Sequence, residues 1–250
     1  MPTFKISASS SAGCVRENNE DMILIGDRFI RNDSLYDIQE FVQNRLIFAL
    51  ADGMGGHNCG EVASSDVLHN LQFFYYDMPV GLHTTDFNEA IYEWLSSMNN
   101  IIDAKGRVDA QFKNMGTTLV ALAFYEDHFY WMNCGDSRLY RFRQNKLQQL
   151  TTDHSLNNLT GEAVHSHIIT NCIGGGCSGS YIDILEFTED VQVGDVFLLC
   201  SDGLSDMVPD RDIETMLSGS ADAKTLCDAA EKAGGFDNVS AILVNYLSAQ

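Results

Sequence analysis

The chain has 250 residues, of which 45% are hydrophobic and 20% are charged, a balance typical of a globular protein that buries a core. Its net charge of −20 disfavours nucleic acid as a partner, because an acidic surface repels a phosphate backbone. No stretch approaches the roughly 20 consecutive apolar residues of a membrane span, so no membrane association is expected.

Seven cysteines are scattered along the chain without a C-x-x-C pair. This usage favours reduced thiols over a disulfide scaffold or a zinc knuckle. The first residues, Met1 to Lys5, lack the basic and apolar regions of a signal peptide. We therefore expect a cytoplasmic protein.

The first half of the chain contains three apolar runs of strand length and two segments with helical spacing. The strands are predicted over Phe4–Ser9, Met22–Ile25 and Leu46–Ala51. Residues 28–44 are polar and irregular, which predicts a loop or a hairpin excursion. Apolar residues at helical spacing predict core-packed helices over Gly60–Tyr76 and over Phe87–Ala104, the latter including Ile101 in its apolar stripe.

The second half is dominated by short strands. Tight turns separate the first four, which predicts an antiparallel meander over Leu119–Tyr125, Phe129–Asn133, Leu139–Phe142 and Leu147–Leu150. Further strands are predicted over Tyr181–Phe187, Val196–Cys200 and Val239–Leu247, and helices over Asp210–Leu217 and Ala221–Ala233. Strands and helices do not alternate one by one, so the fold class is α+β with antiparallel sheets. Without a linker or internal repeat, residues 1–250 are expected to form a single domain.

Acidic residues recur where the predicted strands begin or end. They are Glu20, Asp21, Asp52, Asp136, Asp202 and Asp237. If these strand ends meet at one rim, so many carboxylates cannot all stay ionised unless cations compensate them. Hard oxygen ligands suit Mg²⁺ or Mn²⁺, and the glycine after Asp52 leaves a backbone carbonyl open as a further ligand. Two such ions bridged by one carboxylate would activate a water molecule.

Two of these interpretations have plainer alternatives. Asp52 and Gly53 also fit a strand followed by an ordinary Asp-Gly turn. Arg16 could hold two phosphate oxygens with its guanidinium fork, or it could be a loop arginine paired with Glu17 or Glu20. Local sequence alone leaves both choices open.

Seven short motifs, taken in order, carry a family resemblance. They are Arg16–Asp21, Ala51–His57, Gly116–Thr118, Gly135–Arg138, Asp153–Ser155, Ser201–Leu204 and Asp237–Ser240. Over nearly the whole chain they resemble the motifs of the bacterial metal-dependent protein phosphatases of the PPM, or PP2C, family. The resemblance implies two packed antiparallel β-sheets flanked by pairs of helices, an αββα sandwich. It also implies hydrolysis of phosphoserine and phosphothreonine with a dinuclear metal centre.

The resemblance assigns metal roles to five positions. Asp52 would bridge two Mn²⁺ or Mg²⁺ ions, and the Gly53 carbonyl would bind one of them. Asp202 and Asp237 would bind the other ion. Asp136, together with Asp202, would match a third and weaker metal site.

The resemblance also implies a catalytic set and partners. Glu20 and Asp21 would hold metal-bound waters, and Arg16 would hold the substrate phosphate. Phosphorylated proteins would be the substrates, a cognate Ser/Thr kinase would oppose the enzyme, and the protein would act as a monomer.

The chain departs from the family pattern in two places. Many eukaryotic members carry a histidine directly after the Asp-Gly, whereas this chain has Met54, as bacterial members do, and His57 is displaced. We favour a loop histidine without a role at His57. The segment from Leu156 to Ile169 is short, which predicts a shortened flap and weak discrimination among phosphopeptides.

Rival interpretations are weaker. Gly174–Gly179 fits G-x-G-x-x-G but leads into a strand, so a flexible loop is the better prediction. A non-catalytic, phosphatase-like binding module for metal or phosphoprotein is the alternative from another class. The presence of Asp52, Asp202 and Asp237 together favours an enzyme.

Overall fold

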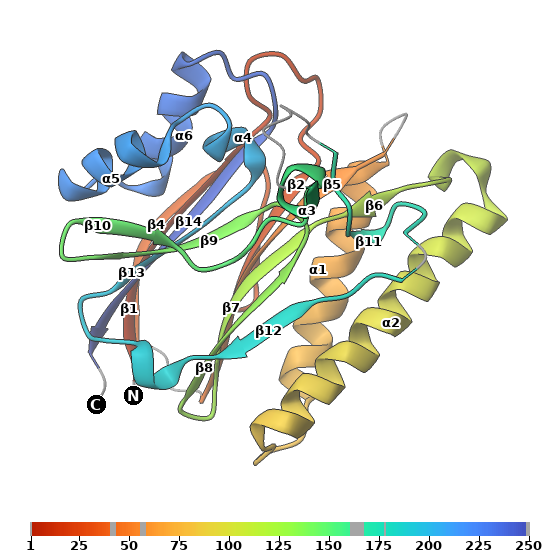
Figure 1. Cartoon of the computed structure of the whole chain (residues 1–250), viewed down its shortest axis with the longest axis horizontal. Helices are drawn as coiled ribbons and strands as arrows, with labels where there is room; N and C mark the ends of the chain where they lie inside the picture. Colours follow the sequence, from red (N-terminus) through yellow and green to blue (C-terminus); the bar gives the residue numbers. More distant parts are fainter. Residues whose placement is uncertain (1, 41–43, 56–58, 161–167, 178, 249–250) are drawn as a thin grey trace.

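Two antiparallel sheets lie face to face between two layers of helices (Figure 1). The computed structural model describes residues 2–40, 44–55, 59–160, 168–177 and 179–248. The two sheets and their outer helices confirm the αββα sandwich predicted from the sequence. None of the described helices is both long and apolar enough to cross a membrane.

The first sheet has six strands in the order β10-β9-β13-β14-β1-β4. Their bounds are β1 Thr3–Ser11, β4 Ser34–Glu40, β9 Arg138–Arg143, β10 Lys146–Gln149, β13 Val196–Cys200 and β14 Val239–Ser248. The long strand β1 lies between β14 and β4 and pairs with both in antiparallel register. The first and last described strands, β1 and β14, therefore lie side by side in this sheet.

The second sheet has eight strands, ordered β11-β6-β5-β7-β8-β12, with β2 paired to β5 and β3 paired to β2. Their bounds are β2 Asp21–Ile25, β3 Arg28–Ile30, β5 Arg45–Met54, β6 Gly116–Thr117, β7 Leu119–Tyr125, β8 His128–Cys134, β11 Ile173–Gly174 and β12 Asp183–Glu186. Strand β5 is central, because it contacts β2, β6 and β7.

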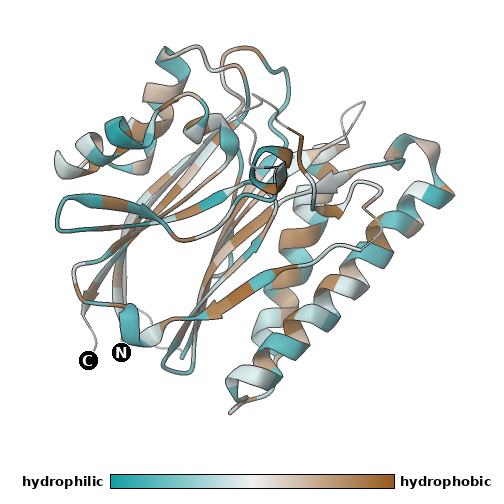
Figure 2. Cartoon of the chain, viewed as in Figure 1, coloured by the Kyte–Doolittle hydropathy of each residue, from teal (hydrophilic) through white to brown (hydrophobic). Residues whose placement is uncertain are grey.

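Helices cover the outer faces of both sheets (Figure 1). The pair α1 (Gly60–Asp77) and α2 (Thr84–Val108) packs on the eight-stranded sheet. The group α4 (Asp202–Ser205), α5 (Asp210–Ser218) and α6 (Ala223–Lys232) packs on the six-stranded sheet. Hydrophobic residues line the strands and alternate with hydrophilic ones around α2 (Figure 2). The short helix α3 (Leu156–Thr160) and two 3-10 turns, Ala110–Phe112 and Thr188–Asp190, complete the described helical structure.

Strand β5 shows why its sequence is apolar without alternation. Leu46, Phe48 and Leu50 point into the core between the sheets. Ile47 and Ala49 point to the other side, into the core beneath α1 and α2. A strand covered on both faces needs apolar residues at every position, so the apolar run continues without a break up to Asp52.

Four details differ from the predicted elements. Residues 28–44, predicted as a loop or hairpin, contribute β3 to one sheet and the edge strand β4 to the other. The predicted meander is split, because β7 and β8 pair in one sheet while β9 and β10 pair in the other. Strand β5 continues past Asp52 to Met54, where its last residues pair with β6. Ile101, predicted in the apolar stripe, is 42% exposed because α2 packs through its neighbouring turns.

Candidate functional site

Two carboxylates face each other across neighbouring strands of the eight-stranded sheet. Asp21 begins β2 and is paired in register with Asp52 of β5. Directly opposed residues of an antiparallel pair lie side by side, so their charges repel. Asp21 is fully buried, and Asp52 is half-buried. This pair is the centre of the site.

Three further carboxylates converge on this pair from other elements. Asp202 begins α4 directly after β13, Asp237 lies just before β14, and Asp136 follows β8. Burial raises the pKa of Asp52 well above its usual value, and the charges of Asp21, Asp202, Asp136 and Asp237 raise it further. The structure thus brings together carboxylates that both sheets supply.

Asp21 has one satisfied and one unsatisfied carboxylate oxygen. The Ser201 hydroxyl donates to Asp21 Oδ2 at 2.8 Å. Asp21 Oδ1 is buried and has no hydrogen-bond partner. Burial raises the pKa of Asp21 to about 7, with a further contribution from the charges of Asp202 and Asp237. A buried, partnerless carboxylate oxygen is costly unless a cation or a proton meets it.

Asp136 lies where the chain crosses from one sheet to the other. Its Oδ1 is also buried without a partner. Burial raises its pKa to about 7, and the charge of Asp202 adds to the effect. The preceding Gly135 has φ of +122°, and a Cβ there would lie 2.7 Å from the Thr118 Cβ. Only glycine allows the chain to turn this close to β7.

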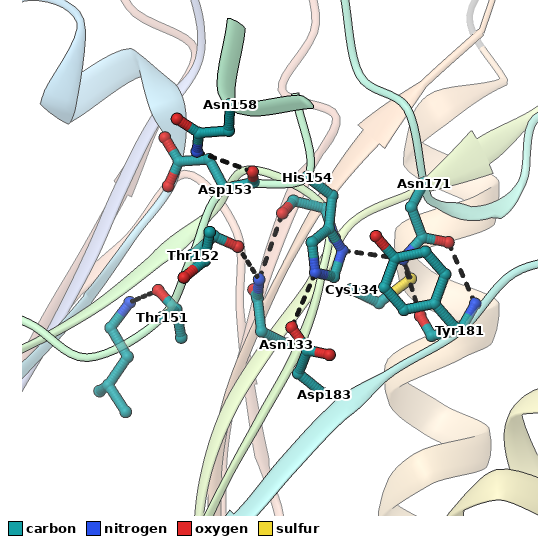
Figure 3. Close-up of polar contacts among 12 residues, drawn as sticks. Asn133, Cys134, Thr151, Thr152, Asp153, His154, Asn158, Asn171, Tyr181 and Asp183 are labelled. Atoms are coloured by element: carbon teal, nitrogen blue, oxygen red, sulfur yellow. Dashed lines mark hydrogen bonds and ion pairs between the residues drawn. The ribbon is translucent and has the colours of Figure 1, made fainter. Parts of the chain in front are cut away.

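A buried histidine fixes that crossing (Figure 3). The Gly135 amide donates to His154 Nδ1 at 3.1 Å, and Asn171 Nδ2 lies 2.8 Å from the same nitrogen. Because Nδ1 accepts, the ring proton resides on Nε2, which donates to Asp183 Oδ2 at 3.0 Å. Asn133 Nδ2 donates to the Gly135 carbonyl at 3.2 Å. His154 holds the Gly135 amide and thereby helps to position Asp136, the next residue in the chain.

Glu20 is held where β5 approaches the start of α1. The Gly53 amide donates to the Glu20 carbonyl at 3.2 Å, and the Gly60 amide donates to Glu20 Oε1 at 3.3 Å. A Cβ on Gly53 would lie 2.1 Å from the Gly60 carbonyl oxygen, so both backbones meet only because these residues are glycines. Burial raises the pKa of Glu20.

Arg16 reaches this cluster from the loop before β2. Its Nη2 lies 2.7 Å from Asp237 Oδ2, and the two side chains are 53% and 42% exposed. The hydrogen bond and the charge of Asp237 raise the pKa of Arg16, with smaller contributions from Glu20 and Asp52. Both sequence alternatives for Arg16, a phosphate ligand or a partner of Glu17 or Glu20, missed this ion pair.

Several supporting residues escaped the sequence reasoning about chemistry. Asn238 Oδ1 accepts from the Glu20 amide at 2.8 Å, and its Nδ2 donates to the Asn18 carbonyl at 2.8 Å. The Thr118 amide donates to the Asp52 carbonyl at 2.9 Å, and the Thr118 hydroxyl accepts from the Asp52 amide at 3.0 Å. Their only sequence signal was membership of the short motifs.

The donor set fits hard divalent cations. All the acidic groups offer oxygen, and Asp21 and Asp136 each present a buried oxygen with no partner. Within the described ranges, no three acidic, histidine or cysteine side chains form a ready ligand cluster as they stand. Asp237 is instead engaged by Arg16. Asp237 Oδ1 accepts from the Asn238 amide at 2.8 Å, so both oxygens of this carboxylate have partners within the chain. His57 lies outside the described residues, as do residues 161–167 of the predicted flap.

Known proteins resemble this chain both in sequence and in structure. The family model described as protein phosphatase 2C matches residues 25–247. Serine/threonine protein phosphatase PstP of Mycobacterium tuberculosis is 32% identical over 252 residues, covering 97% of this chain and 45% of that protein. The chain thus spans about half the length of this relative. Serine/threonine phosphatase stp of Listeria welshimeri is 30% identical over 93% of this chain and 92% of its own. A crystal structure of the PstP catalytic domain in complex with two manganese ions is 31% identical, with a TM-score of 0.76, over 99% of this chain and 100% of that one.

Proposed function

The chain belongs to the protein phosphatase 2C family, and we propose that it hydrolyses phosphoserine and phosphothreonine in proteins with the aid of divalent cations. The observation that carries this proposal is the buried carboxylate cluster around Asp21 and Asp52, with the Arg16 guanidinium at its rim. Buried carboxylates that raise one another's pKa favour a bound cation or a proton, and an arginine fork suits the oxygens of a phosphate group. The manganese ions of the related PstP catalytic domain support the same chemistry.

We assign the metal ligands as follows. Asp52 and the Gly53 carbonyl would hold one Mn²⁺ or Mg²⁺ ion, and Asp52, Asp202 and Asp237 a second. Asp136 with Asp202 would hold a third, weaker ion, which suits the partnerless Oδ1 of Asp136. When bound, such ions neutralise developing negative charge on phosphate oxygens and lower the pKa of water to near neutrality.

The protein's own groups bind and orient. The Arg16 guanidinium, which is paired with Asp237 in this structure, would bind two phosphate oxygens with its fork. Asp21 Oδ1, with Oδ2 fixed by Ser201, would accept a hydrogen bond from water in the site, as would the Glu20 carboxylate, which the Gly60 amide holds in place. His154 keeps Asp136 in place through the Gly135 amide. Together these contacts align water and phosphate for in-line attack.

The remaining assignments concern cellular context. We assign phosphorylated proteins as substrates, with a cognate Ser/Thr kinase that phosphorylates them. We further assign a single domain over residues 1–250, a monomeric state and a cytoplasmic location. The free thiols of the described cysteines support a reducing compartment.

A phosphatase assay tests the central proposal. The full chain is incubated with a phosphothreonine peptide and Mn²⁺, and released phosphate is measured with and without excess chelator. We expect turnover that requires the metal. Binding of the phosphopeptide without any release of phosphate at saturating Mn²⁺ would overturn the proposal and favour a non-catalytic binding module.

A further inference from the structure

Two cysteines that the phosphatase chemistry does not use meet across a glycine turn. Cys172 Sγ and Cys177 Sγ lie 3.1 Å apart. Between them, Gly174, Gly175 and Gly176 all adopt left-handed backbone conformations, with φ of 76°, 64° and 78°. The Cys177 amide donates to the Gly174 carbonyl at 3.0 Å, which closes the turn. The turn therefore holds the two sulfurs face to face.

This turn is fixed to the sheet that carries Asp52. The Gly174 amide donates to Asn99 Oδ1 on α2 at 2.7 Å, and the Gly175 amide donates to the Met115 carbonyl at 2.8 Å. Its strand, β11, pairs with β6, and β6 pairs with the last residues of β5. Gly174 and Gly175 are thus anchored to α2 and to the segment before β6, and the Cys177 amide bonds back to Gly174, which holds the two sulfurs close.

The glycines also leave room for the sulfur atoms. A Cβ at Gly175 would lie 2.7 Å from Cys172 Sγ, so any larger residue there would push the thiol away. A disulfide has an S–S bond of about 2.05 Å, so the two sulfurs need to approach by only about 1 Å more.

The two thiols differ in access to solvent. Cys172 is 3% exposed, whereas Cys177 is half-buried. Burial raises the pKa of Cys172, and its hydrogen bond with Cys177 raises it further. Cys177 is therefore the thiol that a small oxidant reaches first, and Cys172 is the thiol already placed to resolve the product.

We propose that Cys172 and Cys177 are a modification site, at which hydrogen peroxide converts the pair into a reversible intrachain disulfide. Cys177 loses its proton, the thiolate attacks one peroxide oxygen, and the O–O bond breaks to give a sulfenic acid and hydroxide, which takes up that proton as water. Cys172 Sγ then attacks that sulfur, the S–O bond breaks, and the departing hydroxide takes up the thiol proton as water. In sum, two thiols and one peroxide give one disulfide and two waters.

The disulfide would clamp the glycine turn beside the site-bearing sheet. It closes a loop of six residues, counted from Cys172 to Cys177, and so restricts the unfolded chain. For a chain of this size we expect the melting temperature to rise by about 2–8 °C on oxidation.

Tryptic mapping gives a direct test. Trypsin cleaves after Lys146 and Arg211, so Cys172, Cys177 and Cys200 share one peptide, residues 147–211. The folded protein is treated with peroxide, denatured, alkylated with iodoacetamide and digested. We expect this peptide to lose two hydrogen atoms and to take one label instead of three, and dithiothreitol before alkylation should restore three labels.

Matched variants separate this pair from other thiols. Cys177→Ser should show neither the loss of two hydrogens nor the rise in melting temperature, whereas Cys14→Ser, which removes an exposed cysteine outside the turn, should retain both. Four outcomes would overturn the inference: three labels after peroxide, oxygen added without a disulfide, a cross-link to the peptide 114–138 that carries Cys134, or a lower melting temperature on oxidation.

Discussion

Replacing Asp21 by asparagine should stabilise the metal-free protein. Asp21 is fully buried, its Oδ1 has no partner, and neighbouring carboxylates surround it. An amide of the same shape removes the charge, can still accept from Ser201, and offers N–H donors to the carboxylates nearby. Under the role proposed for Asp21, the variant would lose turnover but not folding stability.

The magnitude follows from the pKa of Asp21. Folding raises this pKa from 3.8 to about 7. Each pKa unit corresponds to a tenfold change in proton affinity, or about 1.4 kcal/mol. Ionising Asp21 therefore costs about 4 kcal/mol more in the folded state than in the unfolded chain. The folded state binds the extra proton between pH 4 and pH 7, so stability falls as pH rises through about that window. We expect Asp21→Asn to be about 2–4 kcal/mol more stable than the wild type at about pH 7.5, and the gain to shrink by about 3 kcal/mol near pH 4.5.

Urea unfolding followed by tryptophan fluorescence, with chelator present, measures this difference. Glu93→Gln is a matched control, because Glu93 is an exposed carboxylate on α2 and its replacement should change stability by less than about 0.5 kcal/mol. Saturating Mn²⁺ should reduce or reverse the advantage of the variant. A metal-free Asp21→Asn protein that is less stable than the wild type at pH 7.5, or a gain that is the same at both pH values, would refute the reasoning.

Four other predictions follow from the same site. Asp52→Asn should lower kcat at saturating Mn²⁺ by at least about a hundredfold while circular dichroism stays unchanged, because the shared ligand is lost; near-native turnover would contradict the two-ion assignment. Arg16→Ala should raise KM for a phosphothreonine peptide roughly tenfold or more and leave Mn²⁺ affinity nearly unchanged, since a charge-assisted contact to phosphate is removed. Asp136→Ala should lower turnover while calorimetry still detects two bound ions, and loss of both ions would make Asp136 a primary ligand. His154→Ala should cost about 2–4 kcal/mol in urea unfolding, because the Gly135 amide and the Asn171 side chain lose a buried acceptor; a cost below about 0.5 kcal/mol would remove His154 from its positioning role.

The strands and helices of the layers were predicted well, because the spacing of apolar residues that identifies them is a local pattern in the sequence. The run from Leu46 to Ala51 identified the strand β5, and the helical spacing before Tyr76 identified α1. The family resemblance is confirmed by the match to residues 25–247. The split of the predicted meander was missed because the turn at Gly135 depends on contacts with Thr118 and His154, which are distant in the sequence.

The arrangement of side chains at the site was less accessible from sequence. The positions of the acidic residues in the sequence did not predict that Arg16 would pair with Asp237, because the two are 221 residues apart. The contact between Asp21 and Ser201 spans 180 residues in the same way. Such pairings depend on how the two sheets are docked, which no local pattern encodes. The metal and substrate roles of the acidic residues stay predictions that the variants above test.

The division of the carboxylates between the two sheets has a consequence for the assembly of the molecule. Asp21 and Asp52 belong to the eight-stranded sheet, whereas Asp202 and Asp237 adjoin strands of the six-stranded sheet. Neither sheet alone carries a complete set, so the site comes into existence only when the halves dock. A divalent cation that binds there favours the docked state by mass action, by about 4 kcal/mol at a thousand times its Kd. Cation supply would then set the folding stability of the whole sandwich, because strands of both sheets alternate along the chain and dock as it folds.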